Sequence, residues 1–180
     1  MKATGIVRRI DDLGRVVIPK EIRRTMRIRE GDPLEIYTQK DGEVIFKKYS
    51  PMGELSEFAG QICESLHKTT DAIVAVCDRD AVIAVSGGSR RELLEKRISA
   101  QLEQIMESRR IYRREAEDAA VPVCEDSENL TVSVAAPILS EGDVMGCVLF
   151  AGTADQLTTG EVEYKLIQTV SGFLGKHMES

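Results

Sequence analysis

Two short runs rich in Ile and Val open the pattern of apolar positions, and they predict β-strands at residues 5–10 and 15–18. Branched residues of this kind are enriched in strands because they pack well on a pleated surface. The sequence Asp11-Asp12-Leu13-Gly14 lies between the two runs and is typical of a turn. These residues therefore predict a β-hairpin close to the start of the chain.

A short amphipathic helix is expected directly after this hairpin, over residues 20–27. Pro19 suits the first turn of a helix, where its missing N–H would have no partner anyway. Ile22 and Met26 are four positions apart and share one face. The basic residues fall largely on the other face: Lys20, Arg23, Arg24 and Arg27.

A second hairpin is predicted from strands at residues 34–38 and 44–49, with Lys40-Asp41-Gly42 as the turn. Apolar and polar residues alternate along both strands, so each strand offers one apolar face. About fifty residues with four short strands and one helical turn give a poor core by themselves. Because no disulfide or metal site is available in this region, we expect the unit to be an obligate dimer.

The pattern changes after Ser50-Pro51-Met52-Gly53, and we place a domain boundary there. The predicted organisation is a first domain over residues 1–50, a linker over 51–55 and a second domain over 56–180. Leu55, Phe58, Ile62 and Leu66 recur at helical spacing. Further along the chain we expect strands at 71–77 and 81–85, a helix from about 90, and another that ends near 108. Three strands (111–113, 130–139, 144–152) and a terminal helix from about 161 to 178 complete the order.

Two sequences resemble capping boxes that would open helices of this second domain, Ser89-Arg90-Arg91-Glu92 and Thr158-Thr159-Gly160-Glu161. Helices and strands in this order predict an α+β fold around a mainly antiparallel sheet. The four cysteines (Cys63, Cys77, Cys124, Cys147) are widely spaced without a C-x-x-C pair. We therefore expect buried free thiols in a reducing compartment.

The charge is distributed unevenly along the chain. Residues 1–29 contain nine Lys and Arg against three acids, a net charge of +6, whereas the whole chain has a net charge of −6. Seven of the nine are Arg, which can fork onto phosphate or guanine. This asymmetry favours a nucleic-acid-binding surface at the N-terminus, and a solvated basic face is the alternative. The absence of a long apolar run and of a signal-like start leads us to expect a cytoplasmic protein without membrane contact.

Residues 1–50 resemble the N-terminal module of AbrB-type transition-state regulators, through residues 5–24 and above all Gly14-Arg15-Val16-Val17-Ile18-Pro19. The resemblance implies a swapped-hairpin β-barrel, all-β except for one short helix per chain and built from two interleaved chains. It also implies that Arg8, Arg15, Arg23 and Arg24 contact double-stranded DNA. With their basic neighbours they make up the predicted DNA-binding set, which is Arg8, Arg9, Arg15, Lys20, Arg23 and Arg24.

Residues 53–180 resemble a GAF-type sensory domain, through the order of elements and Val144-Met145-Gly146-Cys147-Val148-Leu149-Phe150-Ala151-Gly152 before the last helix. In such domains the first and last helices commonly pack against a second copy. Different partners for the two domains would give a homotetramer. GAF domains can bind small molecules, but the sequence contains no recognisable cofactor signature. Whether this domain binds a small-molecule ligand, and which one, is left open by the sequence.

Other candidate chemistry is sparse. Ser86-Gly87-Gly88-Ser89 is either an anion cradle or a tight turn, and His67 and His177 suit helix C-terminal ends. Arg109-Arg110-Ile111-Tyr112-Arg113-Arg114 could grip nucleic acid, or it could line a ligand mouth or a subunit contact. No grouping of a nucleophile with His and an acid is visible, and no metal motif. We therefore expect no enzyme.

The combined resemblance is to sporulation regulators that join an AbrB-type module to a GAF-like domain. It implies a DNA-binding transcriptional regulator, activator and repressor, of genes used in spore formation. One alternative is an antitoxin-like DNA- and protein-binding module, because the same barrel serves in toxin–antitoxin pairs. The periodic, core-rich second half differs from the disordered tail that such antitoxins usually offer. A ligand-processing enzyme has only fold analogy in its favour.

Overall fold

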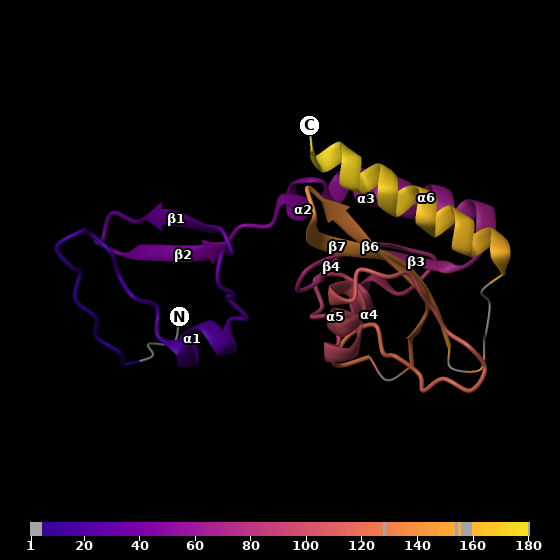
Figure 1. The fold of residues 1–180 in the computed structure, drawn as a ribbon, viewed down its shortest axis with the longest axis horizontal. Coiled ribbons are helices and arrows are strands. Elements are labelled where there is room, and N and C mark those ends of the chain that lie inside the picture. Colours follow the sequence, from indigo (N-terminus) through magenta and orange to yellow (C-terminus); the bar gives the residue numbers. More distant parts are fainter. Residues whose placement is uncertain (1–4, 128, 154, 156–159, 180) are drawn as a thin grey trace. The chain divides into compact units, whose positions relative to one another are not determined.

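The computed structural model describes residues 5–127, 129–153, 155 and 160–179, and the chain divides into two compact units. The first unit is Met1–Tyr49 and the second is Ser50–Ser180 (Figure 1). The division follows Tyr49, next to the Ser50-Pro51 break in the sequence pattern.

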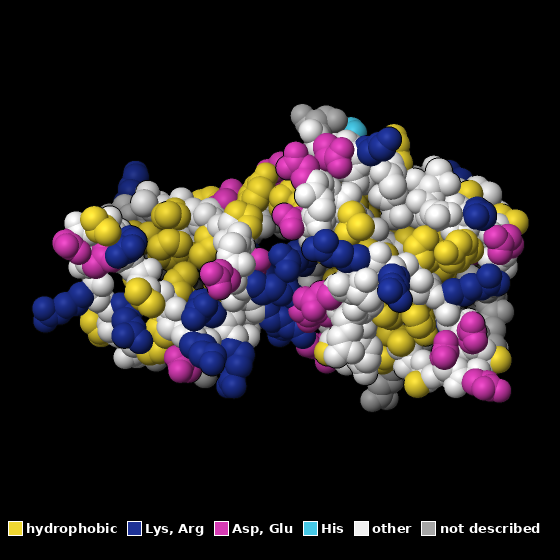
Figure 2. All heavy atoms as spheres, viewed as in Figure 1, with side chains coloured by type: hydrophobic (Ala, Val, Ile, Leu, Met, Phe, Trp, Pro, Cys, Tyr) yellow, Lys and Arg dark blue, Asp and Glu magenta, His cyan; other side chains and the backbone are white. Residues whose placement is uncertain are grey.

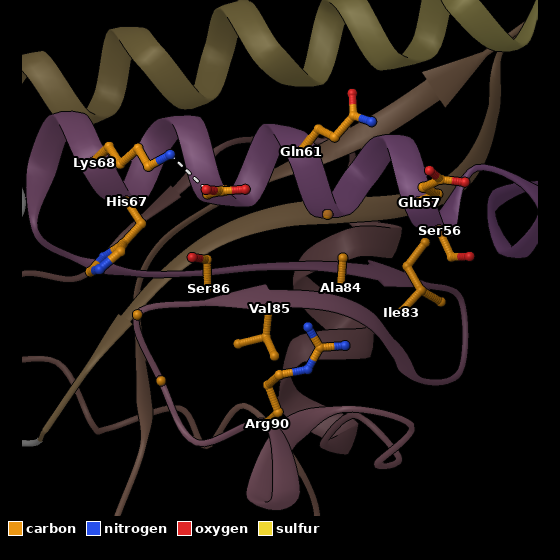
Figure 3. A pocket seen from close by; sticks show the side chains of 14 residues that line it. Ser56, Glu57, Gln61, His67, Lys68, Ile83, Ala84, Val85, Ser86 and Arg90 are labelled. Atoms are coloured by element: carbon orange, nitrogen blue, oxygen red, sulfur yellow. Dashed lines mark hydrogen bonds and ion pairs between the residues drawn. The ribbon is translucent and has the colours of Figure 1, made fainter.

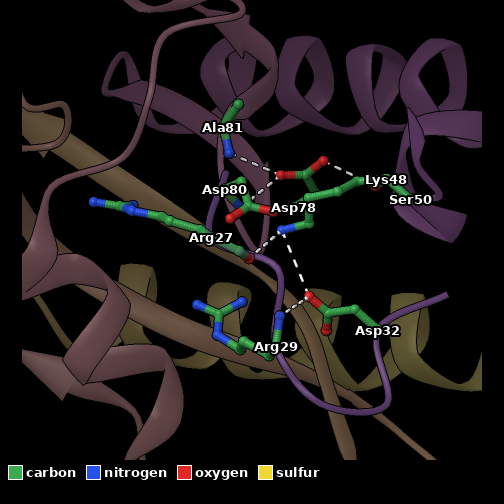
Figure 4. Close-up of polar contacts among 8 residues, drawn as sticks. All are labelled: Arg27, Arg29, Asp32, Lys48, Ser50, Asp78, Asp80 and Ala81. Atoms are coloured by element: carbon green, nitrogen blue, oxygen red, sulfur yellow. Dashed lines mark hydrogen bonds and ion pairs between the residues drawn. The ribbon is translucent and has the colours of Figure 1, made fainter. Parts of the chain in front are cut away.

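The first unit contains the helix α1 (Lys20–Thr25) and one antiparallel hairpin, β1 (Leu34–Thr38) with β2 (Val44–Lys48). The predicted helix and second hairpin are thus confirmed, although α1 ends at Thr25 rather than Arg27. Lys48 ties the loop after α1 to β2 (Figure 4). Its Nζ donates to the Arg27 carbonyl at 2.9 Å and lies 3.7 Å from Asp32 Oδ2, which also accepts the Arg29 N–H at 2.8 Å.

The predicted first hairpin is only partly present within one chain. Its turn forms, since the Asp11 N–H donates to the Arg15 carbonyl and the Gly14 N–H to the Asp11 carbonyl, both at 3.0 Å. The flanking residues 5–10 and 15–18 form no strand in the single chain, so the two strands predicted there are not seen in it. The physical reason is that a strand needs a neighbour to satisfy its backbone groups, and the single chain supplies none there.

Apolar side chains of the first unit are left exposed in the single chain. Val7 is 89% exposed, Leu13 71%, Ile10 69% and Ile36 63%. The hairpin β1–β2 adds Tyr37, Val44 and Phe46 to these exposed apolar side chains. Exposed apolar surface of this extent on so small a unit is typical of a protein–protein interface rather than of a surface in contact with water.

The second unit begins with a helix where a linker was predicted. Helix α2 (Pro51–Glu54) occupies most of residues 51–55, and the Ser50 hydroxyl caps it by accepting the Gly53 N–H at 3.1 Å. Ser50 Oγ also donates to Asp78 Oδ2 at 2.8 Å (Figure 4). Met52 is fully buried in the core of this unit. The segment therefore belongs to the folded second unit, because its one large apolar side chain finds a place in that core.

A five-stranded antiparallel sheet forms the centre of the second unit, in the order β4-β3-β7-β6-β5. Its strands are β3 (Ile73–Asp78), β4 (Val82–Ser86), β5 (Tyr112–Arg113), β6 (Thr131–Ser140) and β7 (Asp143–Gly152). The helices are α3 (Ser56–Thr70), α4 (Arg90–Leu93), α5 (Ala100–Glu107) and α6 (Glu161–Met178). The predicted α+β order is confirmed.

Helices cover both faces of the sheet. Helices α3 and α6 lie side by side on one face, and α4 and α5 lie on the other (Figure 1). Phe150, Ile167 and Leu174 fill the first layer, whereas Leu93, Leu102 and Leu149 fill the second. Val162 and Phe173 on α6 remain 63% and 52% exposed, so α6 has a second apolar stripe that does not face the sheet.

The predicted capping boxes have mixed outcomes. Ser89 is the N-cap of α4 but its side chain makes no capping hydrogen bond, and α4 ends after four residues because Leu94 is extended. Thr158 and Thr159 lie outside the described residues. At the start of α6 the Glu163 carboxylate accepts the Gly160 N–H at 2.8 Å, which satisfies one of the unpaired donors of the helix end.

Gly175 lets α6 approach β6 closely, and a Gly175→Ala chain should be destabilised. A Cβ at this position would lie 2.1 Å from the Leu139 carbonyl oxygen, so the helix would have to move. We expect a loss of about 1–3 kcal/mol in the free energy of unfolding, measured by urea denaturation. Gly172→Ala on the same helix is the matched control, because its Cβ would meet nothing within 4 Å. It should be neutral or stabilising by roughly 0.5–1 kcal/mol, and equal losses in both variants would contradict the prediction.

Candidate nucleic-acid interface

Three of the six predicted DNA-binding residues lie on α1. Lys20, Arg23 and Arg24 are exposed and stand three and four positions apart, so they share one side of the helix. The helix buries none of its own residues, and its first turn begins just after the buried Pro19. Because the helix buries no side chain of its own, these cations stay at the surface, where they can reach a polyanion.

Arg15 follows the turn of the first hairpin and is held by Asp11. Asp11 Oδ1 accepts the backbone N–H groups of Leu13 at 3.0 Å and Arg15 at 2.8 Å. Asp11 Oδ2 accepts the Arg15 Nε–H at 2.8 Å, while the Arg15 side chain stays 69% exposed. The hydrogen bonds from the Arg15 backbone and side chain lower the pKa of the Asp11 carboxyl below its usual value.

Arg8 and Arg9 complete the predicted set in the segment before the turn, and both are exposed. All six predicted residues therefore lie on the surface of the first unit. Figure 2 shows Lys and Arg side chains next to hydrophobic side chains on the visible face of this unit. The structure groups three of the six on α1 and fixes Arg15 through Asp11.

Sequence reasoning missed the role of Asp11, which it used only as a turn residue. The signal that could have found it is the spacing Asp-x-x-Gly-Arg at residues 11–15. Asp side chains often accept backbone N–H groups two residues on, which places the next Arg within reach of the second carboxylate oxygen.

The arginines of residues 109–114 have a different environment. Arg113 Nη1 lies 3.6 Å from Glu161 Oε2, and Arg114 Nη1 donates to Thr131 Oγ1 at 3.3 Å. Both residues thus interact with their own unit, at the sheet edge formed by β5. Arg109 and Arg110 are exposed. Of the alternatives for this segment, a nucleic-acid grip is weakened because half of its cations bind groups of their own unit.

A groove of about 710 Å³ lies between α3 and β4 and contains the Ser86-Gly87-Gly88 turn (Figure 3). Lys68 and Glu64 form an ion pair at 2.6 Å along its wall. His67 Nδ1 lies 2.8 Å from the Ala72 carbonyl oxygen, and a Cβ on Gly87 would come within 2.4 Å of the same nitrogen. Close packing against His67 and a φ of +78° explain why a glycine occupies position 87. This structural reason favours the tight turn over the anion cradle.

All four cysteines are buried and free, as the sequence predicted. Burial raises the pKa of Cys63 to about 12 and that of Cys124 to about 11, and a hydrogen bond with Cys147 raises the pKa of Cys77. Among the described residues no group of three His, Cys, Asp or Glu side chains is placed to hold a metal ion. In the same part of the chain, no helix combines the length and apolarity needed to cross a membrane.

Because the pKa values of these thiols are raised, we expect the free energy of unfolding to depend on pH in the alkaline range. A folded pKa above the unfolded value means that the stabilisation is complete below about pH 9 and is lost as pH rises towards the folded values. We expect the free energy of unfolding by urea to fall between pH 9 and pH 11, and to fall less in a Cys63→Ala chain. An identical pH dependence in the two chains would contradict this prediction.

The comparisons with known proteins also divide the chain into two parts, with the boundary four residues further along than in the structure. The family model "Stage V sporulation protein T C-terminal, transcription factor" matches residues 54–179. The model "Antidote-toxin recognition MazE, bacterial antitoxin" matches residues 7–53. Stage V sporulation protein T of Bacillus subtilis (strain 168) is 52% identical over 182 residues, 99% of each chain.

Two further similarities concern single units. Transition state regulatory protein AbrB of the same strain is 63% identical over 51 residues, which are 28% of this chain and 52% of AbrB. The crystal structure of the GAF domain/HD domain protein from Geobacter sulfurreducens aligns with 69% of this chain and with 91% of the Geobacter chain. The TM-score is 0.51 and the sequence identity is 19%. That similarity shows the fold alone. The resemblance to AbrB and the GAF-like fold are thereby confirmed, and the chain belongs to the stage V sporulation protein T family of transcription factors.

Proposed function

We propose that this chain is a sequence-specific DNA-binding regulator of sporulation genes, activating some and repressing others. The observation on which the proposal rests is a set of six exposed Lys and Arg side chains on a unit 63% identical to a transition-state regulator. In this proposal Arg8, Arg9, Arg15, Lys20, Arg23 and Arg24 contact double-stranded DNA. Such a protein acts in the cytoplasm, where bacterial DNA is found.

The chemistry of these residues suits a duplex. Arginine presents a planar fork that can bond two oxygens of a phosphate, or O6 and N7 of a guanine, whereas Lys20 supplies a point charge. Contacts to phosphates position the protein, and contacts to base edges select the sequence. We assign the cations of α1 mainly to phosphates and Arg15 to base edges, since the hydrogen-bonded turn and Asp11 hold Arg15 in one direction.

The first unit acts as a dimer in this proposal. Its exposed apolar residues, among them Val7, Ile10 and Ile36, need a cover, and residues 5–10 and 15–18 need strand partners. A second copy supplies both through interleaved hairpins, and symmetry then presents two sets of arginines to one duplex.

The second unit provides a second interface in this proposal. On α6 the exposed Phe173 packs beside Phe58 of α3, with ring centroids 6.0 Å apart, and the His177 ring is stacked with Phe173 and tilted to Phe58. Together with Val162 this apolar stripe suits pairing with another copy, so a tetramer results when the two units choose different partners. The GAF-like unit then serves assembly, signal sensing, or both, without an evident cofactor.

The match of residues 7–53 to an antitoxin model favours one second candidate, a DNA- and protein-binding antitoxin. The second unit argues against it, because its sheet is packed on both faces and is not a disordered tail. Limited proteolysis separates the two candidates. Rapid loss of everything after Tyr49 would favour the antitoxin, and a resistant second unit would favour the regulator.

Selection of duplexes from a randomised pool by the purified full chain tests the proposed function. A regulator of this kind should enrich a limited set of related sequences and bind them with strong salt dependence. Recovery of duplexes without any shared sequence or shape, at an affinity equal to that of poly(dI·dC), would overturn it.

A further inference from the structure

We propose that Asp11 is a positioning residue that aims the guanidinium of Arg15 at the edges of bases, an inference that rests on the proposed function. The two carboxylate oxygens have separate tasks. Oδ1 closes the turn by accepting the N–H groups of Leu13 and Arg15, and Oδ2 accepts the Arg15 Nε–H at 2.8 Å. One side chain thus fixes the backbone from which Arg15 extends and the direction of its guanidinium.

Asp11 leaves the two terminal nitrogens of the Arg15 guanidinium available for another contact. Asp11 takes only Nε, and the two terminal Nη groups make no other hydrogen bond or ion pair among the described residues. The side chain is 69% exposed, so the fork faces solvent. A long flexible side chain loses less freedom on binding when it is already held in one direction. Asp11 therefore prepares Arg15 for a contact that needs a fixed angle.

Simple charge counting gives the opposite expectation for Asp11. A carboxylate at a DNA-facing surface repels phosphates, so its removal by itself should tighten binding. Asp12 offers the matched control because it is the next residue, is exposed, and makes no hydrogen bond or ion pair among the described residues. Any difference between Asp11→Asn and Asp12→Asn at equal charge reports the bond from Asp11 to Arg15.

The Asn variant separates the two tasks of Asp11. Its amide oxygen can still accept the Leu13 and Arg15 N–H groups, whereas its NH₂ group faces the Arg15 Nε–H as a second donor. The turn is preserved while the hold on the guanidinium is lost. The lowered pKa of the Asp11 carboxyl agrees with a charged partner for Arg15 at neutral pH.

The experiment compares binding of the full chain to one duplex selected by the wild type and to poly(dI·dC), by fluorescence anisotropy. We expect Asp11→Asn to weaken binding to the selected duplex by about tenfold, with poly(dI·dC) binding unchanged or tighter. Asp12→Asn should leave both affinities unchanged or tighter. In an Arg15→Ala background, Asp11→Asn should cause no further loss, because Asp11 acts through Arg15.

Three results would overturn the proposal. Tighter binding to both duplexes by Asp11→Asn, as in Asp12→Asn, would show charge alone. Equal weakening on both duplexes, or further loss in the Arg15→Ala background with a lowered melting temperature, would show a general structural role. A wild-type chain that does not distinguish the selected duplex from poly(dI·dC) would instead reject the proposed function, before any Asp11 variant is compared.

Discussion

A chain with both Arg15→Ala and Arg23→Ala should lose at least about a hundredfold in affinity for a duplex selected by the wild type. Each Arg that forks onto a base or phosphate contributes on the order of 1–3 kcal/mol, and in a symmetric dimer each substitution removes two such arginines. The log–log salt slope should also become shallower, by about 0.9 for each phosphate that the variant no longer neutralises. Fluorescence anisotropy titrations over a series of salt concentrations measure both quantities.

Arg110→Ala is the control for this double variant, because Arg110 is an exposed arginine of the second unit. It removes one positive charge per chain, where the double variant removes two, without touching the proposed interface, and it should leave affinity and slope as in the wild type. Wild-type affinity and salt slope in the double variant would show that Arg15 and Arg23 do not contact the duplex.

The second large effect is expected from Ile36→Glu in β1. Ile36 is 63% exposed in the single chain, so the substitution should cost little if that chain is the folded species. If a second copy covers Ile36, an unpaired carboxylate is buried, and the first unit should lose about 3 kcal/mol or more. We expect that unit to unfold and DNA binding to disappear, while the second unit keeps its own unfolding transition.

Gln39→Glu is the matched control for Ile36→Glu, because it introduces the same charge in the exposed turn of the same hairpin. Urea denaturation monitored by circular dichroism, together with sedimentation velocity, reports folding and assembly of both variants. Equal behaviour of Ile36→Glu and Gln39→Glu would argue that Ile36 stays open to solvent.

Much of the second unit could be predicted from periodicity. Strands β6 and β7 are long apolar runs, and the spacing of Leu55, Ile62 and Leu66 indicated α3. Turn and capping signals predicted the lengths and ends of the helices less well. Ser89 precedes a helix as expected, yet α4 is a single turn because the chain leaves it again at Leu94.

The first unit shows the limit of reasoning from local sequence patterns. Val16 and Val17 have the character of strand residues, but the single chain places no strand beside them. The exposed basic residues were visible as a charge pattern. The hold of Asp11 on Arg15 was missed, because the spacing Asp-x-x-Gly-Arg indicates it only when the direction of the side chains is considered as well as the residue types.

The central claim, that paired first units present their arginines to one duplex, is tested most directly by sedimentation equilibrium of the full chain with a selected duplex. One chain has a mass of 19.9 kDa. The account predicts no free species of that mass and an even number of chains on each duplex. A duplex occupied by a single 19.9 kDa chain with a folded first unit would contradict it.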